Sequence, residues 1–254
     1  MYLTVRGVVL RVTDYNDRDA LLTLHTQNYG KLTAKARGLR RKNSPLTAPC
    51  QLLAFGEFVL FEYRGQYTIN EAHSIELFPR LRRELTKLSL GSYFAQVVDL
   101  ISQEDTPSPE LQSLLLNCLY ALANLDIPEL VVKAVFELRC ACIAGFQPDL
   151  FGCHRCGNQQ PDRFDLSGGH LECKDCQDGA HSGIRLPVTP TMLDAMRYIC
   201  LCDPKKMFSF RISKEAEAQL SALTEAYLAT QLERGFSALD FYKSLWQEPQ
   251  ANHT

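Results

Sequence analysis

The feature that most limits the fold of this chain is a change in the period of its apolar residues near position 78. Before that point, stretches such as "LTVRGVVLRV" (3–12) and "KLTAKARG" (31–38) alternate as strands with one buried face do. After it, Leu90, Phe94 and Val97 recur at helical spacing. The sequence therefore predicts an α+β multidomain protein, with a β-module followed by helices.

The β-module is punctuated by short polar turns. "DYNDRD" (14–19), "QNYG" (27–30), the basic loop "LRRKNSPLTAP" (39–49) and Arg64-Gly65 separate its alternating segments. Five or so short strands in fewer than 80 residues are the complement of an OB-fold barrel. We therefore expect an OB-fold barrel over residues 1–78.

The helical part shows several start and stop signals. Ser108-Pro109-Glu110 is typical of an N-cap, an N1 proline and a first-turn acid, and Ser213 is a second expected cap, with Gly235 after its helix. Helices are predicted over about 78–102, from 108 onward, from about 128 to Gly145, and over about 189–202, 213–234 and 237–246. The chain is thus expected to divide into a barrel (1–78), the first part of a helical bundle (79–149), a zinc-binding insertion (150–184), the second part of the bundle (185–247) and a polar tail (248–254).

Two cysteine pairs lie inside the expected insertion. Cys153-x2-Cys156 and Cys173-x2-Cys176 are separated by a 16-residue spacer, which fits the spacing of a structural zinc ribbon. Two residues between cysteines allow a tight turn that directs both sulfur atoms to one ion. We predict one structural Zn²⁺ bound by these four residues. Alternative ligands nearby are His154, His170 and His181.

An enzymatic role for this metal is not expected. Catalytic zinc keeps a position open for water, whereas four thiolates fill the tetrahedron. The zinc-deaminase signature fails, because "HLE" (170–172) directly adjoins Cys173 and no proline precedes either pair. The chain also lacks the G-x-S-x-G, P-loop and dinucleotide-binding motifs. The remaining cysteines are interpreted as core or loop thiols: Cys50, Cys118, Cys140, Cys142, Cys200 and Cys202.

Charge is distributed unevenly along the chain. Residues 1–87 contain 14 Lys and Arg against 8 Asp and Glu, whereas residues 88–254 contain 13 against 21. This asymmetry favours a polyanionic partner for the first part, and a fluctuation in a near-neutral protein is the alternative. No apolar run approaches the roughly 18 residues of a membrane span. The first residues lack the features of a signal peptide, so a cytoplasmic protein without membrane contact is expected.

The most basic stretch is "KLTAKARGLRRK" (31–42), which contains no acidic residue. Closely packed like charges repel one another, and a phosphate backbone relieves that repulsion. The alternative is a solvated edge strand that its charges protect from aggregation. Tyr29 at a turn, and Tyr63 and Tyr67 flanking Arg64-Gly65, are candidates for base stacking, whereas Phe55, Phe58 and Phe61 are expected in the barrel core. The predicted DNA-binding residues are Lys31, Lys35, Arg37, Arg40, Arg41, Lys42, Arg80, Arg82 and Arg83.

Together these motifs resemble the RecO family of bacterial recombination mediators in DNA repair. The resemblance is strongest in "VRGVVLRVTDYNDRDALLTLHTQNYGKLTAKARGLRRKNS" (5–44), and it extends through the expected barrel, the helices and the paired cysteines over nearly the whole chain. Members usually read K-G-A-R where this chain has Lys35-Ala36-Arg37-Gly38, so the turn into the loop is expected one or two residues later.

The resemblance implies a protein without enzymatic activity. Members bind single- and double-stranded DNA and anneal complementary strands, including strands coated with single-stranded-DNA-binding protein. With RecR they help load the recombinase onto coated gaps. They also bind the acidic C-terminal tail of the single-stranded-DNA-binding protein in a pocket of the helical domain, for which Arg139 and Arg197 are unassigned candidates here. A bacterial cytoplasmic protein that joins the nucleoid when active is implied.

A second interpretation is a zinc-ribbon regulator of transcription or RNA, in which the cysteine module itself contacts nucleic acid. The part of the module after its first cysteine pair argues against it, because Arg163 and Lys174 are outnumbered there by Asp162, Asp165, Glu172 and Asp175. Acidic side chains are poorly placed against phosphate. A scaffold without any nucleic-acid role is the remaining alternative.

Overall fold

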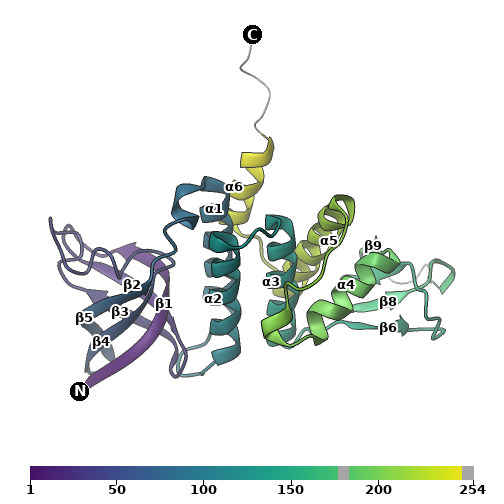
Figure 1. The fold of residues 1–254 in the computed structure, drawn as a ribbon. Helices are drawn as coiled ribbons and strands as arrows, with labels where there is room; N and C mark the ends of the chain where they lie inside the picture. Colours follow the sequence, from purple (N-terminus) through teal and green to yellow (C-terminus); the bar gives the residue numbers. More distant parts are fainter. Residues whose placement is uncertain (177–182, 248–254) are drawn as a thin grey trace, which may run out of the picture. The chain divides into compact units, whose positions relative to one another are not determined.

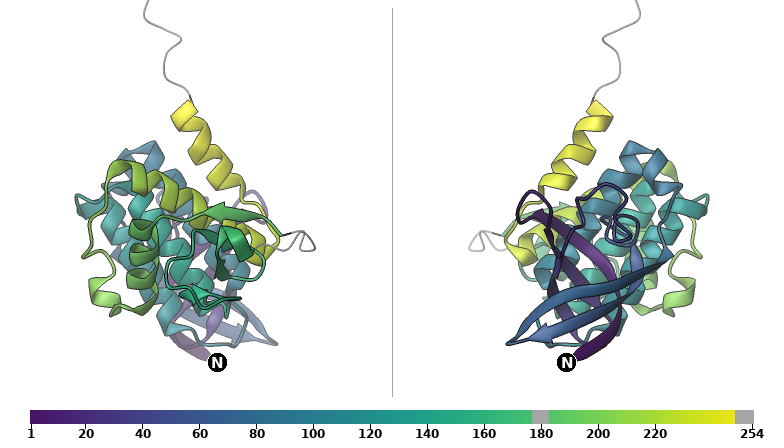
Figure 2. Two further views of the ribbon diagram at one scale, coloured as in Figure 1. Left: turned by 90° about the vertical axis from the view of Figure 1, so that its right-hand side faces the viewer. Right: turned by 90° about the vertical axis from the view of Figure 1, so that its left-hand side faces the viewer.

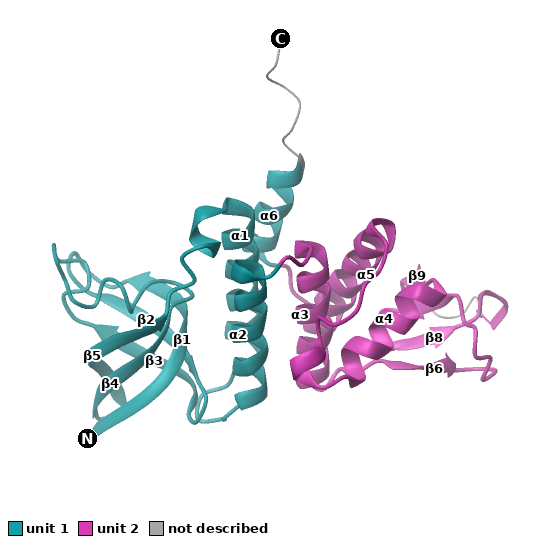
Figure 3. Ribbon diagram, in the orientation of Figure 1, with its two compact units in different colours: residues 1–125, 236–254 teal, residues 126–235 magenta. Residues whose placement is uncertain are grey.

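The structure, a computed structural model, describes residues 1–176 and 183–247. Two compact units divide the chain, one formed by residues 1–125 and 236–254 (unit 1) and the other by residues 126–235 (unit 2; Figure 3). The expected tail at 248–254 and His181 lie outside the described residues. Within the described part, no helix is long and apolar enough to cross a membrane.

Unit 1 contains a closed barrel of five strands (Figures 1 and 2). Its neighbours follow the order β1-β2-β3-β5-β4, and β4 pairs with β1 to complete the circle. All neighbours are antiparallel except β3 and β5, whose register pairs are Ala34 with Tyr67 and Lys35 with Thr68. The predicted OB-like barrel is confirmed. The strands are β1 (Tyr2–Asp14), β2 (Ala20–Thr26), β3 (Gly30–Ala36), β4 (Phe55–Tyr63) and β5 (Gln66–Glu76).

Alternation of side chains explains why these segments form a barrel. In β3 the apolar Leu32, Ala34 and Ala36 point into the core, while Lys31 and Lys35 are only partly covered. The core continues with residues of the other four strands and of the loop between β3 and β4: Val5, Val9, Leu22, Leu24, Leu46, Phe58, Leu60 and Ile69. Burial of this apolar surface is the main force that closes the barrel.

Three helices complete unit 1: α1 (Leu85–Ile101), α2 (Pro109–Asn124) and α6 (Ser237–Gln247). α1 contacts β1, β2, α2 and α6, and the rings of Tyr93 and Phe236 meet edge to face at 5.4 Å. The predicted start of the first helix at 78 is wrong. A separate short 3₁₀ turn, η1 (Leu81–Arg83), comes first, and Glu84 is extended with φ −117° and ψ 114°.

Unit 2 is built on α3 (Glu129–Ile143), α4 (Pro190–Leu201) and α5 (Lys214–Leu232), with the short turn η3 (Pro204–Lys206) between the last two. α3 packs against α5 and α4. The Ser213 hydroxyl accepts the Ala216 N–H, so the predicted cap of α5 is confirmed. The left-handed residue that ends α5 is Glu233, with φ +50°, rather than the expected Gly235.

A buried ion pair lies between α3 and α5. The ammonium group of Lys133 is 3.0 Å from a Glu137 carboxylate oxygen and 2.9 Å from one of Glu225, and it also donates to Ser221. Burial raises the pKa of Glu137, although Lys133 and the Thr224 hydroxyl favour its charged form. Two carboxylates thus compensate the buried ammonium group, and the contact of Lys133 with Glu225 joins α3 to α5.

A small four-stranded sheet follows α3 and carries the paired cysteines. Its strands are β6 (Asp149–Cys153), β7 (Arg163–Asp165), β8 (His170–Glu172) and β9 (Arg185–Pro187), in the order β6-β8-β7-β9. A 3₁₀ turn, η2 (Lys174–Cys176), comes directly after β8. The sheet thus delivers Cys153 from the end of β6 and Cys173 from the end of β8, side by side in parallel strands.

Candidate nucleic-acid interface and metal centre

The four paired cysteines converge on one point in unit 2. The Sγ atoms of Cys153, Cys156, Cys173 and Cys176 all lie within 4.8 Å of one another, and the Sγ atoms of Cys156 and Cys173 are 3.8 Å apart. A tetrahedral zinc with Zn–S bonds of about 2.3 Å would separate its sulfur ligands by about 3.8 Å. The arrangement therefore fits a four-coordinate metal ion with four sulfur ligands.

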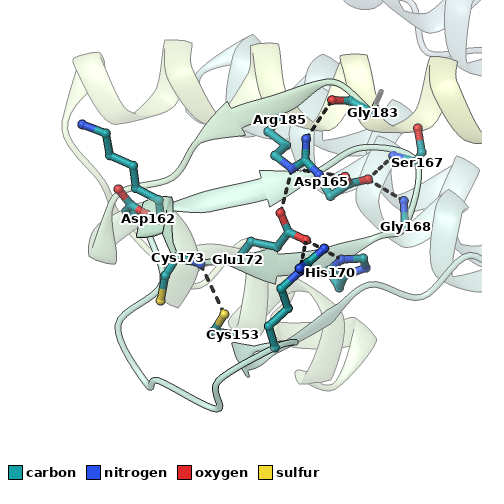
Figure 4. A network of polar contacts seen from close by, with 12 residues as sticks. Cys153, Asp162, Asp165, Ser167, Gly168, His170, Glu172, Cys173, Gly183 and Arg185 are labelled. Carbon is teal, nitrogen blue, oxygen red and sulfur yellow. Dashed lines mark hydrogen bonds and ion pairs between the residues drawn. The ribbon is translucent and has the colours of Figure 1, made fainter. Parts of the chain in front are cut away.

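Local hydrogen bonds prepare the sulfur atoms for a metal. The Cys173 N–H donates to the Cys153 Sγ at 3.3 Å (Figure 4), and the Asn158 side chain donates to the Cys173 Sγ at 3.3 Å. Burial raises the pKa of Cys153, but the N–H groups of Cys156, Arg155 and Cys173 outweigh it and lower the pKa to about 6. The thiolate is the form that binds a metal.

The nearby histidines belong to a different cluster. The Glu172 carboxylate accepts a hydrogen bond from Arg185 Nε at 2.7 Å and lies 3.4 Å from His170 Nε2 (Figure 4). Within the described residues, the metal-binding group consists of the four cysteines and includes neither His154 nor His170. These contacts join β8 to β9 beside the metal site. The charges of Glu172 and Arg185 therefore compensate each other within the sheet.

The basic stretch of the barrel is split into two sets by contacts within the protein. One set is paired with carboxylates of unit 1, and its members are partly buried or tethered. Lys31 Nζ lies 3.5 Å from an Asp99 carboxylate oxygen, Lys35 Nζ 3.2 Å from one of Asp19, and Arg40 Nη1 2.8 Å from one of Asp14. Half of the predicted cations in this stretch are therefore already compensated.

The other set consists of Arg37, Arg41 and Lys42, which we call the open cations. All three are exposed, and none forms an ion pair with any residue that the structure describes. They line a hollow of about 590 Å³ on the barrel, together with residues of β1, β4 and β5. The lining of this hollow is therefore cationic, and a polyanion can enter it.

Two aromatic rings line the same hollow. Tyr2 in β1 is directly opposite Phe61 in β4, with ring centroids 5.3 Å apart, and their exposed fractions are 63% and 40%. The expectation that Phe61 lies in the core is wrong, whereas Phe58 is fully buried as expected. Residues 58 and 61 differ in parity along β4, so they point to opposite faces, and this signal could have identified Phe61.

The turn that leads to the open cations is fixed by one carboxylate. Asp19 accepts the Gly38 N–H at 2.8 Å and an Asn16 side-chain N–H at 3.1 Å. The Gly38 N–H is the largest cause that lowers the pKa of Asp19 to about 2, and Asn16 and Lys35 add to it. Gly38 has φ +68°, a conformation that favours glycine, and it directly follows Arg37.

The second predicted basic group lies on η1 rather than on a helix. The Arg82 guanidinium donates to the Leu77 carbonyl at 2.9 Å and to the Leu52 carbonyl at 2.6 Å, so it fastens η1 to the loop before β4. Arg80 and Arg83 are exposed and form no ion pair with the described residues. The structure therefore places Arg80 directly before η1 and Arg83 at its end, and gives Arg82 a structural contact.

The arginines considered for a peptide pocket are engaged within unit 2. Arg139 Nη2 donates to the Cys202 carbonyl, and Arg197 Nε donates to the Leu150 carbonyl at 2.8 Å. Arg197 also lies 3.5 Å from an Asp194 carboxylate oxygen. Neither residue marks a pocket by these contacts.

Comparison with known families agrees with both halves of this architecture. The family model described as "Recombination protein O N terminal" matches residues 1–78, which is the barrel with its open cations. The model described as "Recombination protein O C terminal" matches residues 82–240, which include the four cysteines. The chain belongs to the RecO family. The family that the barrel, helices and cysteines resembled is thereby confirmed.

Similar RecO proteins match over nearly their whole length. A protein named DNA repair protein RecO from Acetivibrio thermocellus is 31% identical, over 96% of this chain and 97% of the relative. A DNA repair protein RecO from Alkaliphilus metalliredigens is 28% identical, over 96% of this chain and 100% of the relative. One from Caldicellulosiruptor saccharolyticus is 30% identical, over 95% of this chain and 98% of the relative.

Proposed function

We propose that this chain is a DNA-binding mediator of recombinational repair that has no enzymatic activity. In this proposal it anneals complementary single strands and helps load the recombinase onto coated single-stranded DNA. Its partners are single- and double-stranded DNA, RecR and the C-terminal tail of the single-stranded-DNA-binding protein, and it acts in the bacterial cytoplasm at the nucleoid. Membership in the RecO family supports the repair role, and the barrel supports contact with DNA.

The observation that carries the proposal is the hollow that combines the open cations with Tyr2 and Phe61. Phosphates release condensed counterions when Arg or Lys neutralises them, which drives association. Unpaired bases stack on exposed aromatic rings irrespective of their sequence. One hollow thus offers contacts for both the backbone and the bases of a single strand.

Annealing requires no bond to be made or broken in the protein. Two strands repel each other because both are polyanions, and a cationic surface lowers that repulsion while they pair. The paired set of Lys31, Lys35 and Arg40 contributes less to this effect, since each already faces a carboxylate. The open cations therefore carry the proposed screening.

The test is strand annealing of complementary oligonucleotides, bare or coated with single-stranded-DNA-binding protein. We expect the unmodified protein to accelerate annealing and the triple variant R37E/R41E/K42E to lose that acceleration. For the same variant, the slope of log affinity against log salt should fall by about 0.7 for each phosphate of a single strand that the protein no longer neutralises.

A matched control reverses three exposed cations of unit 2, in the variant K205E/K206E/R211E. Its net-charge change equals that of the barrel variant, so a non-specific charge effect would weaken both proteins equally. Equal losses in the two variants, or an unchanged barrel variant, would contradict the proposal.

The proposed metal is one structural Zn²⁺ held by Cys153, Cys156, Cys173 and Cys176. When bound, the ion cross-links the ends of β6 and β8 to the turn η2. Four thiolates fill its coordination sphere, so the cysteines brace the sheet and present no site for substrate. A zinc-ribbon regulator that contacts nucleic acid through this module is disfavoured, because Arg155 and Arg185 in its hollow already face the carboxylates of Glu172 and Asp165.

A further inference from the structure

Three further thiols gather at the C-terminal ends of α3 and α4, separate from the four-cysteine group. The Sγ atoms of Cys142 and Cys200 are 3.8 Å apart, and Cys202 follows as the C-cap of α4. All three are partly exposed, whereas Cys118 and Cys140 are fully buried. The interpretation of Cys142 and Cys200 as ordinary core thiols therefore leaves their close approach unexplained.

A positive charge lies beside these thiols. Arg139 Nη2 donates to the Cys202 carbonyl at 2.5 Å and to the Cys202 Sγ at 3.0 Å. Among the described residues no carboxylate pairs with Arg139, and its Nε is buried without a hydrogen-bond partner. Its charge is therefore available to stabilise a neighbouring thiolate.

The pKa values of the two facing thiols are shifted in opposite directions. The hydrogen bond with Cys200 lowers the pKa of Cys142, burial opposes this, and the charge of Arg139 lowers it further. The same hydrogen bond and burial raise the pKa of Cys200. One partner thus favours the nucleophilic thiolate and the other retains its proton, as in pairs where one cysteine attacks the oxidant and the second resolves the product.

We infer that Cys142 and Cys200 form a reversible redox pair that a peroxide converts to a disulfide. The Cys142 thiolate attacks one peroxide oxygen and the O–O bond breaks. Hydroxide departs as the leaving group, and Cys142 becomes a sulfenic acid. The Cys200 sulfur then attacks the Cys142 sulfur, the S–O bond breaks, and the departing hydroxide takes the Cys200 proton as water. Two thiols and one hydrogen peroxide give one disulfide and two waters once the first hydroxide is protonated.

The geometry needs only a small adjustment. The sulfur atoms must approach from 3.8 Å to about 2.05 Å. Cys142 and Cys200 lie in the last turns of α3 and α4, where the ends of helices yield more readily than their middles. The bond would join α4 to α3, and α4 is also tied to β6 by the Arg197–Leu150 hydrogen bond. Oxidation would therefore restrain the segment that leads to the metal-binding cysteines.

The experiment treats the metal-loaded protein with hydrogen peroxide, blocks free thiols and maps the linked peptides without reduction. Chymotrypsin cleavage after Phe146 separates Cys142 from Cys153, so a link to the metal site is distinguishable. We expect a Cys142–Cys200 cross-link that dithiothreitol removes, and slower cross-linking in Arg139→Gln. In Cys200→Ser, a sulfenic-acid probe should label Cys142.

Controls separate this pair from its neighbours. Cys140→Ser and Cys202→Ser should retain the cross-link, whereas Cys142→Ser should lose it while keeping its circular dichroism spectrum. Full alkylation of Cys142 and Cys200 after peroxide treatment would overturn the inference. So would a link from Cys142 to Cys202 in place of Cys200.

Discussion

Asp19 shows how a single carboxylate shapes the candidate DNA surface. It pairs with Lys35 and so compensates the charge of that cation. It also accepts the Gly38 N–H, which fixes the turn after Arg37. The sequence predicted the basic stretch but not this division, because compensation depends on partners from other elements. Lys31, for example, meets Asp99 on α1, 68 positions away.

The first prediction concerns the acidity of Asp19. Its pKa is about 2 in the folded protein, below the usual 3.8, so its contribution to stability is present above about pH 4 and is lost as pH falls through about 2. A carboxyl-carbon NMR titration should give this low midpoint. The Asp19→Asn variant should lack the signal and loosen the Gly38 turn. A midpoint at 3.8 would contradict the hydrogen bonds assigned to Asp19.

The second prediction concerns base stacking. The double variant Y2A/F61A should bind single-stranded DNA more weakly by about 1–3 kcal/mol for each base that no longer stacks. Its salt slope should stay unchanged, because the variant keeps every cation that neutralises a phosphate. Tyr120→Ala removes an exposed ring from α2 as a control, with an exposed fraction between those of Tyr2 and Phe61. Fluorescence anisotropy at several salt concentrations measures both quantities, and equal affinity of Y2A/F61A and the unmodified protein would exclude stacking here.

At the level of elements, period and capping signals predicted the helices well, and the exceptions have tertiary causes. The first helix starts at Leu85 rather than near 78, since Arg82 bonds the Leu77 and Leu52 carbonyls and holds η1 against the barrel. A sequence pattern contains no record of such contacts. The expected domain segments stay a prediction, and the compact units instead group α1, α2 and α6 with the barrel.

The third prediction compares two serines that precede helices. Ser213 accepts the Ala216 N–H, whereas Ser108 makes no side-chain cap bond to α2 despite its favourable sequence. Ser213→Ala should therefore lower the free energy of unfolding by about 1 kcal/mol, because the helix loses its cap. Ser108→Ala should change it little. Urea unfolding measures both, and equal effects would show that the Ser213 bond is unimportant.

At the level of the whole molecule, the cysteine spacing predicted the sulfur cluster because all four ligands come from one local motif. The fourth prediction follows: one zinc per chain in elemental analysis, and a lower melting temperature after chelation or in C153A/C173A. Cys50→Ser is a control thiol outside the cluster. A double variant that melts like the parent, with its metal content unchanged, would contradict a structural metal.

Unit 1 is assembled from two separate stretches, because α6 follows unit 2 and packs on α1, where Phe236 directly before α6 meets Tyr93. A ribosome therefore delivers all of residues 126–235 before that last helix exists. The face of α1 that α6 covers stays bare on the nascent chain during this interval. Folding of the amino-terminal unit thus finishes only after the unit encoded in its middle has been made.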